Sequence, residues 1–215
     1  MFSKIFPKIH AEGYKFLVIS GILTLGLYSL SDFLGLIGLV ITIWVYYFFR
    51  DPERVIIDDD SYLVSPADGL ITDISEKSGP EELRLENISF TKISVFMNVF
   101  NCHVNRVPSS GKVEEIFYKP GKFLNASLDK ASEENERNYF KVKLNNGEEI
   151  IIVQIAGLIA RRIVCEVEQG QELKQGDRIG MIRFGSRVDI YFKNKKVLAK
   201  LGQNVVAGES LLASE

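Results

Sequence analysis

The chain has 215 residues and a formal net charge of −2. This suits one domain with an appendage and argues against a nucleic-acid binder, which usually carries a basic excess. Two cysteines, Cys102 and Cys165, are too few for a disulfide framework, so we expect reduced thiols. The two histidines, His10 and His103, form no zinc motif, so we predict no metal site.

An apolar segment occupies residues 16–49, with Asp32 as its one charged residue. As a single straight helix it would be about 51 Å long, far beyond a hydrocarbon core of roughly 30 Å. The polar residues within 29–32 mark a natural break. The pattern therefore predicts a helical hairpin with arms at 16–30 and 33–49.

Basic residues flank this hairpin on both sides: Lys4, Lys8 and Lys15 before it, Arg50 and Arg54 after it. By the positive-inside rule both ends are cytoplasmic. A cleaved signal peptide and a buried hairpin of a soluble domain are the alternatives. We interpret residues 1–50 as a membrane-inserted or re-entrant hairpin. Residues 51–215 are then a domain on the cytoplasmic face of the cell membrane.

The rest of the chain has the pattern of short strands separated by turns. Residues 93–99 are rich in β-branched and aromatic side chains, and residues 111–118 alternate like a half-buried strand. Two further apolar runs, 139–144 and 148–155, flank Asn146-Gly147, a strong hairpin signal.

A weak internal repeat supports the same fold class. Residues 170–177 and 202–209 share the pattern Gly-Gln-x-apolar-x-x-Gly-acid. Such strand-turn units are common in lipoyl-like barrel-sandwich folds. We therefore predict a mainly β fold of barrel-sandwich, lipoyl-like strand units, with the apolar helical hairpin at its N-terminus.

Two side chains are candidates for proton transfer. His103 follows a predicted buried strand, and imidazole titrates near pH 6.5, which suits it to act as a general base. Asp68 lies in an Asp-Gly turn, where it is either structural or placed to orient an imidazole. Cys102 is adjacent to His103, but neighbours on an extended chain point to opposite faces, so the two should not form a catalytic pair.

The Gly185–Ser186 pair lies between two apolar runs, 179–182 and 188–192. It is either a plain hairpin turn or a self-cleavage site. Glycine leaves its carbonyl open to attack, and the serine hydroxyl can attack it to give an ester. Elimination and hydrolysis would then leave a pyruvoyl group at the new N-terminus.

Two other features leave further functions open. A lysine in a tight turn, here Lys130, is how lipoyl and biotinyl carriers present their prosthetic group, although the residues after it are not a strand. Arg161 and Arg162 are either a solvated pair or contacts for a phosphate. A membrane-anchored carrier or binding module is thus an alternative to an enzyme.

Taken together, these residues resemble the phosphatidylserine decarboxylase proenzyme family in its short bacterial and archaeal form. The matching stretches, in the family's order, are Phe48–Pro52, Ser65–Gly69, Asn98–Pro108, Gly121–Arg137, Gln154–Cys165 and Arg183–Asp189. The closely related archaetidylserine decarboxylases share this form, and the sequence does not separate the two substrates.

The resemblance implies a lyase that depends on a covalent pyruvoyl group derived from Ser186. Cleavage between Gly185 and Ser186 would give chains of residues 1–185 and 186–215. The serine amine of a phospholipid would condense with the pyruvoyl ketone, and its carboxylate would leave as carbon dioxide. The two chains are expected to stay associated, and a homodimer is one oligomeric state that we consider.

The resemblance also suggests residue roles. Asp68, His103 and Ser186 form the expected catalytic triad, and the expected substrate-binding residues are Phe123, Asn125, Arg106 and Arg161. The chain departs from the best-known members at one place, since Arg106 stands where those members have a second histidine. Either His103 serves both self-cleavage and decarboxylation, or another group assists.

Overall fold

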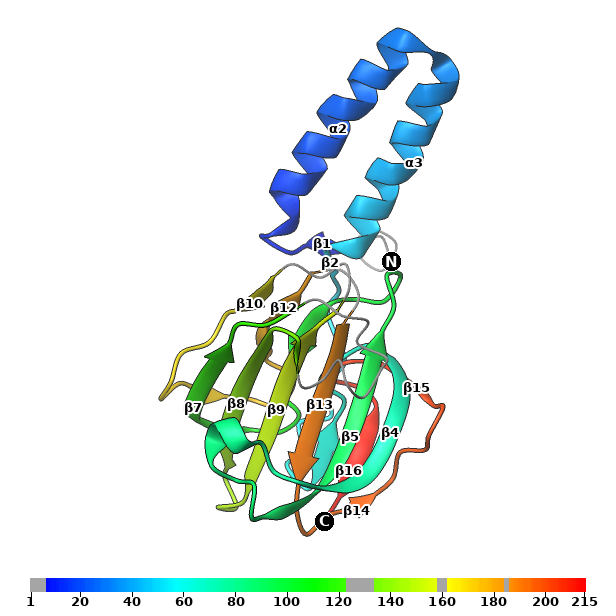
Figure 1. Ribbon diagram of the computed structural model, residues 1–215. Coiled ribbons are helices and arrows are strands. Elements are labelled where there is room, and N and C mark those ends of the chain that lie inside the picture. The colour runs from blue at the N-terminus through cyan, green and yellow to red at the C-terminus, as the bar shows by residue number, and fades with distance from the viewer. Residues whose placement is uncertain (1–6, 123–133, 158–161, 184–185) are drawn as a thin grey trace. The chain divides into compact units, whose positions relative to one another are not determined.

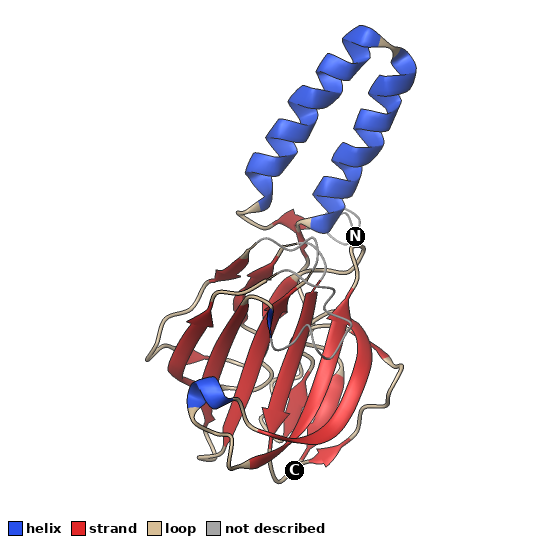
Figure 2. Ribbon diagram, in the orientation of Figure 1, coloured by secondary structure: helices blue, strands red, loops and turns tan. Residues whose placement is uncertain are grey.

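The computed structural model describes residues 7–122, 134–157, 162–183 and 186–215 (Figure 1). The chain divides into two compact units, Met1–Glu53 and Arg54–Glu215. Both α-helices of the described residues belong to the first unit, and nearly all strands belong to the second (Figure 2). The prediction of a mainly β fold with an N-terminal apolar helical hairpin is confirmed.

The first unit is a helical hairpin closed by a short pair of strands. Helices α2 (Gly13–Leu30) and α3 (Asp32–Phe48) are separated by Ser31, whose extended backbone ends one helix and begins the next. Strands β1 (Lys8–Ile9) and β2 (Arg50–Asp51) pair antiparallel at the open end. The predicted break is correct, and each helix starts slightly earlier than its predicted arm.

Small and hydroxyl side chains allow the two helices to approach each other. A side chain at Gly35 would collide with the Tyr28 ring, and one at Gly38 would meet Thr24. The hydroxyls of Thr24 and Thr42 are 2.9 Å apart and hydrogen bond across the hairpin. Few residues of α2 are buried. Its large apolar side chains therefore point away from the hairpin's own contacts.

The second unit is built on an eight-stranded antiparallel sheet with the order β11-β7-β8-β9-β13-β5-β4-β15. Its strands are β4 (Gly69–Ser78), β5 (Ser89–Met97), β7 (Gly111–Lys119), β8 (Arg137–Leu144), β9 (Glu149–Ala156), β11 (Glu172–Leu173), β13 (Ser186–Phe192) and β15 (Asn204–Val205). Gly147, in the predicted hairpin turn, has a positive φ of 86°.

Two three-stranded sheets complete the unit. One has the order β10-β12-β6, formed by β10 (Ile163–Cys165), β12 (Arg178–Ile182) and β6 (Val104–Arg106). The other has the order β14-β16-β3, formed by β14 (Lys196–Val197), β16 (Leu211–Ser214) and β3 (Tyr62–Val64). A short 3-10 helix, η1 (Glu81–Leu83), lies between β4 and β5.

A hydrophobic cluster packs on each face of the large sheet. Successive side chains of a strand point to opposite faces, so one strand contributes to both clusters. On β13, Val188, Ile190 and Phe192 belong to the main core. The other face carries a smaller cluster that includes Leu83 from η1, and Tyr191 of β13 packs against it. This alternation decides the face to which each site residue of β13 belongs.

The sequence repeat forms two equivalent strand-turn units. Residues 170–173 lead into β11, which pairs with β7, and residues 202–205 lead into β15, which pairs with β4. In each copy the glutamine side chain accepts a hydrogen bond of 3.0 Å from the backbone N–H three residues earlier. Gly176 and Gly208 both have positive φ, and a side chain added at either position would meet Ile56. The two units thus provide the strands at the two opposite edges of the large sheet.

Candidate active site

Ser186 is the first residue of β13, in the interior of the large sheet. It lies opposite Met97 of β5 on one side and Ala156 of β9 on the other. Its side chain is completely buried, and by alternation it faces the same side as Val188 in the main core. The hydroxyl lies 4.0 Å from the Met97 sulfur. The reacting side chain predicted from the sequence is therefore shielded from water.

The Gly185–Ser186 junction does not join paired strands. β12 ends at Ile182 and belongs to a three-stranded sheet, whereas β13 begins at Ser186 and belongs to the large sheet. The alternative of a plain hairpin turn is therefore wrong. Gly185 itself lies outside the described residues. Because β12 and β13 belong to different sheets, neither strand constrains the other by direct pairing.

The backbone of His103 is hydrogen bonded to the last residue of β12. Its carbonyl accepts a hydrogen bond of 3.3 Å from the N–H of Ile182. The imidazole is completely buried, with Nδ1 3.0 Å from the carbonyl oxygen of Asn101. Because a carbonyl only accepts, Nδ1 donates in this bond, and a neutral imidazole then has its lone pair on Nε2. This tautomer is suited to accept a proton.

Asp68 is tied to two other parts of the fold. Arg54 donates from Nη2 to both carboxylate oxygens, at 2.8 and 2.7 Å, and the N–H of Ala207 donates to Oδ1 at 2.8 Å. The Asp68 turn also lies beside β6, because the Arg106 N–H donates to the Pro66 carbonyl at 2.9 Å. β6 begins directly after His103. A role for Asp68 in orienting His103 stays a prediction.

The sequence did not identify Arg54 as the partner of Asp68, because Arg54 is one of several basic residues near the hairpin. Burial acts to lower the pKa of Arg54, but the attraction of Asp68, and then of Cys102, outweighs it and raises the pKa. Arg54 therefore carries its charge beside Asp68 and near the Cys102–His103 segment. Its side chain is only 12% exposed.

A chain of buried amides reaches the residue that contacts Ser186. Asn138 donates to Gln154 at 3.4 Å, Gln154 donates to Asn105 at 2.8 Å, and Asn105 donates to the Met97 sulfur at 3.6 Å. These side chains are at most 2% exposed. In the sequence, the only sign of this network is that Asn and Gln occur within segments that otherwise have the pattern of strands. It fixes Met97 against the Ser186 hydroxyl.

The predicted substrate-binding residues are only partly described. Phe123, Asn125 and Arg161 lie outside the described residues, as does Lys130 of the carrier alternative. Arg106 is buried, and its Nη1 donates to the Gly176 carbonyl at 2.8 Å. Its assignment to the substrate stays a prediction.

A covalent group derived from Ser186 can be tested against the described surroundings of that side chain. The neighbours of Ser186 across the sheet, Met97 and Ala156, are uncharged and buried. A small uncharged ketone in place of the serine side chain is compatible with these surroundings.

Comparison with known sequences decides the family. The sequence model described as phosphatidylserine decarboxylase matches residues 41–213. The chain is 68% identical to a phosphatidylserine decarboxylase proenzyme of Pelagibacter ubique over 215 residues, which is all of both chains. It is 50% identical to that of Ruegeria pomeroyi over 206 residues, covering 95% of this chain and 94% of the relative.

The chain belongs to the phosphatidylserine decarboxylase family. A third relative, from Rickettsia typhi, is 47% identical over 213 residues, covering 99% of this chain and 92% of the relative. The resemblance found in the sequence is confirmed, and the matched region contains Asp68, His103 and Ser186. Membership in this enzyme family favours a decarboxylase over a carrier module.

Proposed function

We propose that this chain cleaves itself between Gly185 and Ser186 and then decarboxylates phosphatidylserine to phosphatidylethanolamine. Membership in the decarboxylase family carries the proposal. The burial of Ser186 at the start of an interior strand supports it, because a shielded hydroxyl reacts with its neighbouring carbonyl without competition from water.

In self-cleavage the Ser186 oxygen attacks the Gly185 carbonyl carbon while its proton passes to a base. We assign the base to His103, whose Nε2 carries the lone pair in the tautomer favoured by Asn101. The C–N bond then breaks, so the acyl group is transferred to oxygen and the Ser186 nitrogen takes up a proton. Loss of the Cα proton of residue 186 then breaks its Cβ–O bond, which releases residues 1–185 with a terminal carboxylate and leaves a dehydroalanine. Addition of water to its tautomer, with release of ammonia, would give the pyruvoyl group.

The pyruvoyl group, once formed, would supply the electron sink that decarboxylation needs. His103 returns a proton to the lipid carbon from which the carboxylate leaves. Burial by the main core excludes water from this step, and basic residues bind the lipid phosphate. One imidazole serves both reactions in this scheme.

The small chain, residues 186–215, stays bound after cleavage. Its strand β13 pairs along its length with β5 and β9, while β15 pairs with β4 and β16 with β3. All of these partner strands belong to residues 1–185. Backbone hydrogen bonds and the shared core therefore hold the two chains together without a covalent link.

The hairpin brings the enzyme to its substrate in the membrane. Helix α2 is long and apolar enough to cross a membrane, and α3 is apolar but slightly shorter. We assign residues 1–50 to the bilayer and residues 51–215 to a catalytic domain on the cytoplasmic side, because basic residues flank both ends of the hairpin. The acyl chains of the substrate can then remain in the bilayer.

Intact-mass spectrometry of the full-length protein and of Ser186→Ala tests the proposal. The wild type is expected to give fragments 1–185 and 186–215, the smaller one beginning with pyruvoyl, and Ser186→Ala is expected to stay whole. Ser89→Ala, at an exposed position of β5, is the matched control and should split like the wild type. An unsplit wild type, or a Ser186→Ala protein that still splits, would overturn the assignment.

A further inference from the structure

Glu136 directly precedes β8, at the end of the large sheet that carries Ser186. The pairing of β8 with β9 continues through this residue, because the Ala156 N–H donates to the Glu136 carbonyl at 3.0 Å. Ala156 in turn lies opposite Ser186 of the next strand. Glu136, Ala156 and Ser186 therefore form one row across the sheet.

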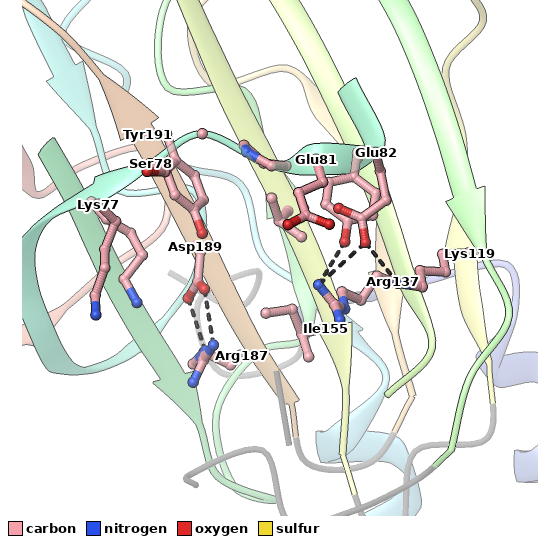
Figure 3. A pocket seen from close by; sticks show the side chains of 15 residues that line it. Lys77, Ser78, Glu81, Glu82, Lys119, Arg137, Ile155, Arg187, Asp189 and Tyr191 are labelled. Carbon is pink, nitrogen blue, oxygen red and sulfur yellow. Dashed lines mark hydrogen bonds and ion pairs between the residues drawn. The ribbon is translucent and has the colours of Figure 1, made fainter. Parts of the chain in front are cut away.

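The side chain of Glu136 faces the same side of the sheet as the Ser186 hydroxyl. Arg137, Ile155 and Arg187 form the adjacent row, and all three line a cavity on the opposite face (Figure 3). Successive residues of a strand point to opposite faces, so the row that contains Glu136 points toward the main core. Glu136 is only 4% exposed.

On the core face the Glu136 carboxylate bonds a second sheet. Its Oε1 accepts a hydrogen bond of 3.1 Å from the N–H of Ile163, the first residue of β10. Ile163 pairs with Ile182, the last residue of β12. One residue further, the Arg183 N–H donates to the Arg162 carbonyl at 3.2 Å. The strand before the proposed cleavage site is therefore held against the β10 segment as far as Arg183.

Asn135 fixes the strand on the other side of the cleavage site. Its side chain is completely buried, and its Nδ2 donates to the Ala156 carbonyl at 2.7 Å. Ala156 thus has its N–H bonded by Glu136 and its carbonyl bonded by Asn135. A Cβ added at Gly121 would collide with the Asn135 backbone, so this segment is closely packed. The position opposite Ser186 is held by two adjacent residues.

The Glu136 carboxylate is held by neutral donors. Besides the Ile163 N–H, the Tyr118 hydroxyl donates to Oε1 at 3.0 Å, and Glu136 forms no ion pair with the residues that the structure describes. A neutral acceptor oxygen in the same place would accept the same two bonds. A positioning role needs only this oxygen, whereas proton transfer needs an ionisable group. The two roles can therefore be separated by an isosteric substitution.

We propose that Glu136 is a positioning residue for self-cleavage and that Asn135 assists it. Glu136 links the strands on both sides of the Gly185–Ser186 bond, although these strands belong to different sheets. Attack requires the serine oxygen and the carbonyl carbon to approach within about 3–3.5 Å in the correct orientation, so misaligned strands slow the reaction. The inference rests on the self-cleavage proposed above, and both residues act through their neighbours.

The rate of splitting tests this role. The full-length chain is synthesised without cells into lipid nanodiscs, translation is stopped, and the fragments are followed over time on denaturing gels. Glu136→Leu is expected to split about tenfold more slowly than the wild type. Glu136→Gln should split at nearly the wild-type rate, because its amide oxygen accepts both bonds. Asn135→Asp, which lacks the N–H donor, should be slowed by a similar factor.

Lys195→Met is the matched control for a general loss of stability. The Lys195 side chain is 1% exposed and forms ion pairs with Glu148 and Glu215 at 3.3 and 3.4 Å. Glu148 directly precedes β9, at the opposite end of that strand from Ala156. Lys195→Met should lower Tm without slowing the reaction. Equal slowing in this variant would overturn the inference.

The substitutions at Glu136 give two further outcomes that would overturn it. Glu136→Leu splitting at the wild-type rate would show that the contacts do not matter to the reaction. Glu136→Gln as slow as Glu136→Leu would show that the charge, and not the acceptor oxygen, is required.

A second measurement does not depend on self-cleavage. In the unsplit Ser186→Ala protein, hydrogen exchange at the Ile163 and Arg183 amides should be about tenfold faster with Glu136→Leu than with Glu136→Gln. Equal exchange in the two variants would overturn the positioning role. If the wild type stays whole, the proposed function fails, and the exchange rates still decide whether Glu136 holds the two strands.

Discussion

Asp68, for which we predict a role in catalysis, is also held by contacts within the fold. It accepts hydrogen bonds from Arg54 and from the Ala207 backbone, and the ion-paired side chains are only 12% and 13% exposed. Removing one partner of such a pair leaves a buried charge uncompensated, which is costly. A loss of activity at Asp68 would therefore have two explanations, and a single substitution cannot separate them.

We predict that Asp68→Asn lowers the unfolding free energy by about 3 kcal/mol, equivalent to a fall in Tm of roughly 6–10 °C, and also slows self-cleavage. The double variant Arg54→Met/Asp68→Asn removes the orphaned charge and should recover most of the lost Tm. If Asp68 orients His103, the double variant still cleaves slowly. Recovery of cleavage together with Tm would show that Asp68 acts only in folding.

At the scale of secondary-structure elements, the hydrogen-bonded side-chain amides link three strands of the large sheet to β6. Gln154 of β9 bridges Asn138 of β8 and Asn105 of β6, and Asn105 contacts Met97 of β5. A buried amide without its partner costs about 1–3 kcal/mol, so the network specifies how these strands meet. It also positions the thioether beside Ser186.

Asn105→Leu is expected to slow self-cleavage by about tenfold, equivalent to about 1.4 kcal/mol in the barrier, because Met97 loses the contact that holds it against Ser186. Asn138→Leu, at the distant end of the same network, is the matched control. It should lower Tm to a similar degree but leave the rate of splitting near that of the wild type. Equal slowing in both variants would indicate a general loss of packing.

The short helix η1 should be held in place by a pH-dependent ion pair. Burial acts to raise the pKa of Glu82, but the hydrogen bond from Lys119, together with further hydrogen bonds and the charge of Arg137, lowers it below its ordinary value of 4.5. A carboxyl group whose folded pKa is depressed stabilises the fold above its unfolded pKa. This contribution is lost as pH falls through the folded pKa.

Glu82→Gln is accordingly predicted to lower Tm by about 2–4 °C at pH 7, with the difference disappearing as pH falls below the ordinary value of 4.5. Thermal unfolding of both proteins across this range measures the effect. Glu86→Gln, an exposed change on the same connection between β4 and β5, should show no such dependence. A constant difference at all pH values would refute the ion-pair explanation.

For the molecule as a whole, the two cysteines provide a test of which side of the membrane the second unit faces. Cys165 is exposed and Cys102 is buried. If residues 51–215 face the cytoplasm, a membrane-impermeant maleimide should label Cys165 in inside-out vesicles and not in intact cells. The Cys165→Ser protein should remain unlabelled in both. Labelling of intact cells would place this domain on the opposite side of the membrane.

The whole-molecule organisation also explains how cleavage can leave the fold intact. Residues 186–215 contribute strands to two sheets, and every strand of this segment that pairs with residues 1–185 does so antiparallel. Breaking the chain before Ser186 removes a connection between two sheets and no ladder hydrogen bond within β13. We therefore expect the N-terminus made by the proposed cleavage to keep its place in the sheet.

Local features of this protein follow directly from its residues. The break at Ser31, the turn at Gly147 and the repeated turns at Gly176 and Gly208 depend on the backbone preferences of a few neighbouring amino acids, which a sequence displays openly. The family could likewise be recognised, because its motifs preserve residue type and order along the chain.

Other features arise only when distant segments meet. The sequence left the Gly185–Ser186 junction open as a hairpin turn, and it did not indicate the Arg54–Asp68 pair or the Gln154–Asn105 bond. Strands β12 and β13 are neighbours in sequence yet pair with different partners, and Gln154 meets a residue 49 positions away. Alternation shows that a segment is a strand but does not name its partner, because pairing depends on the packing of the whole core.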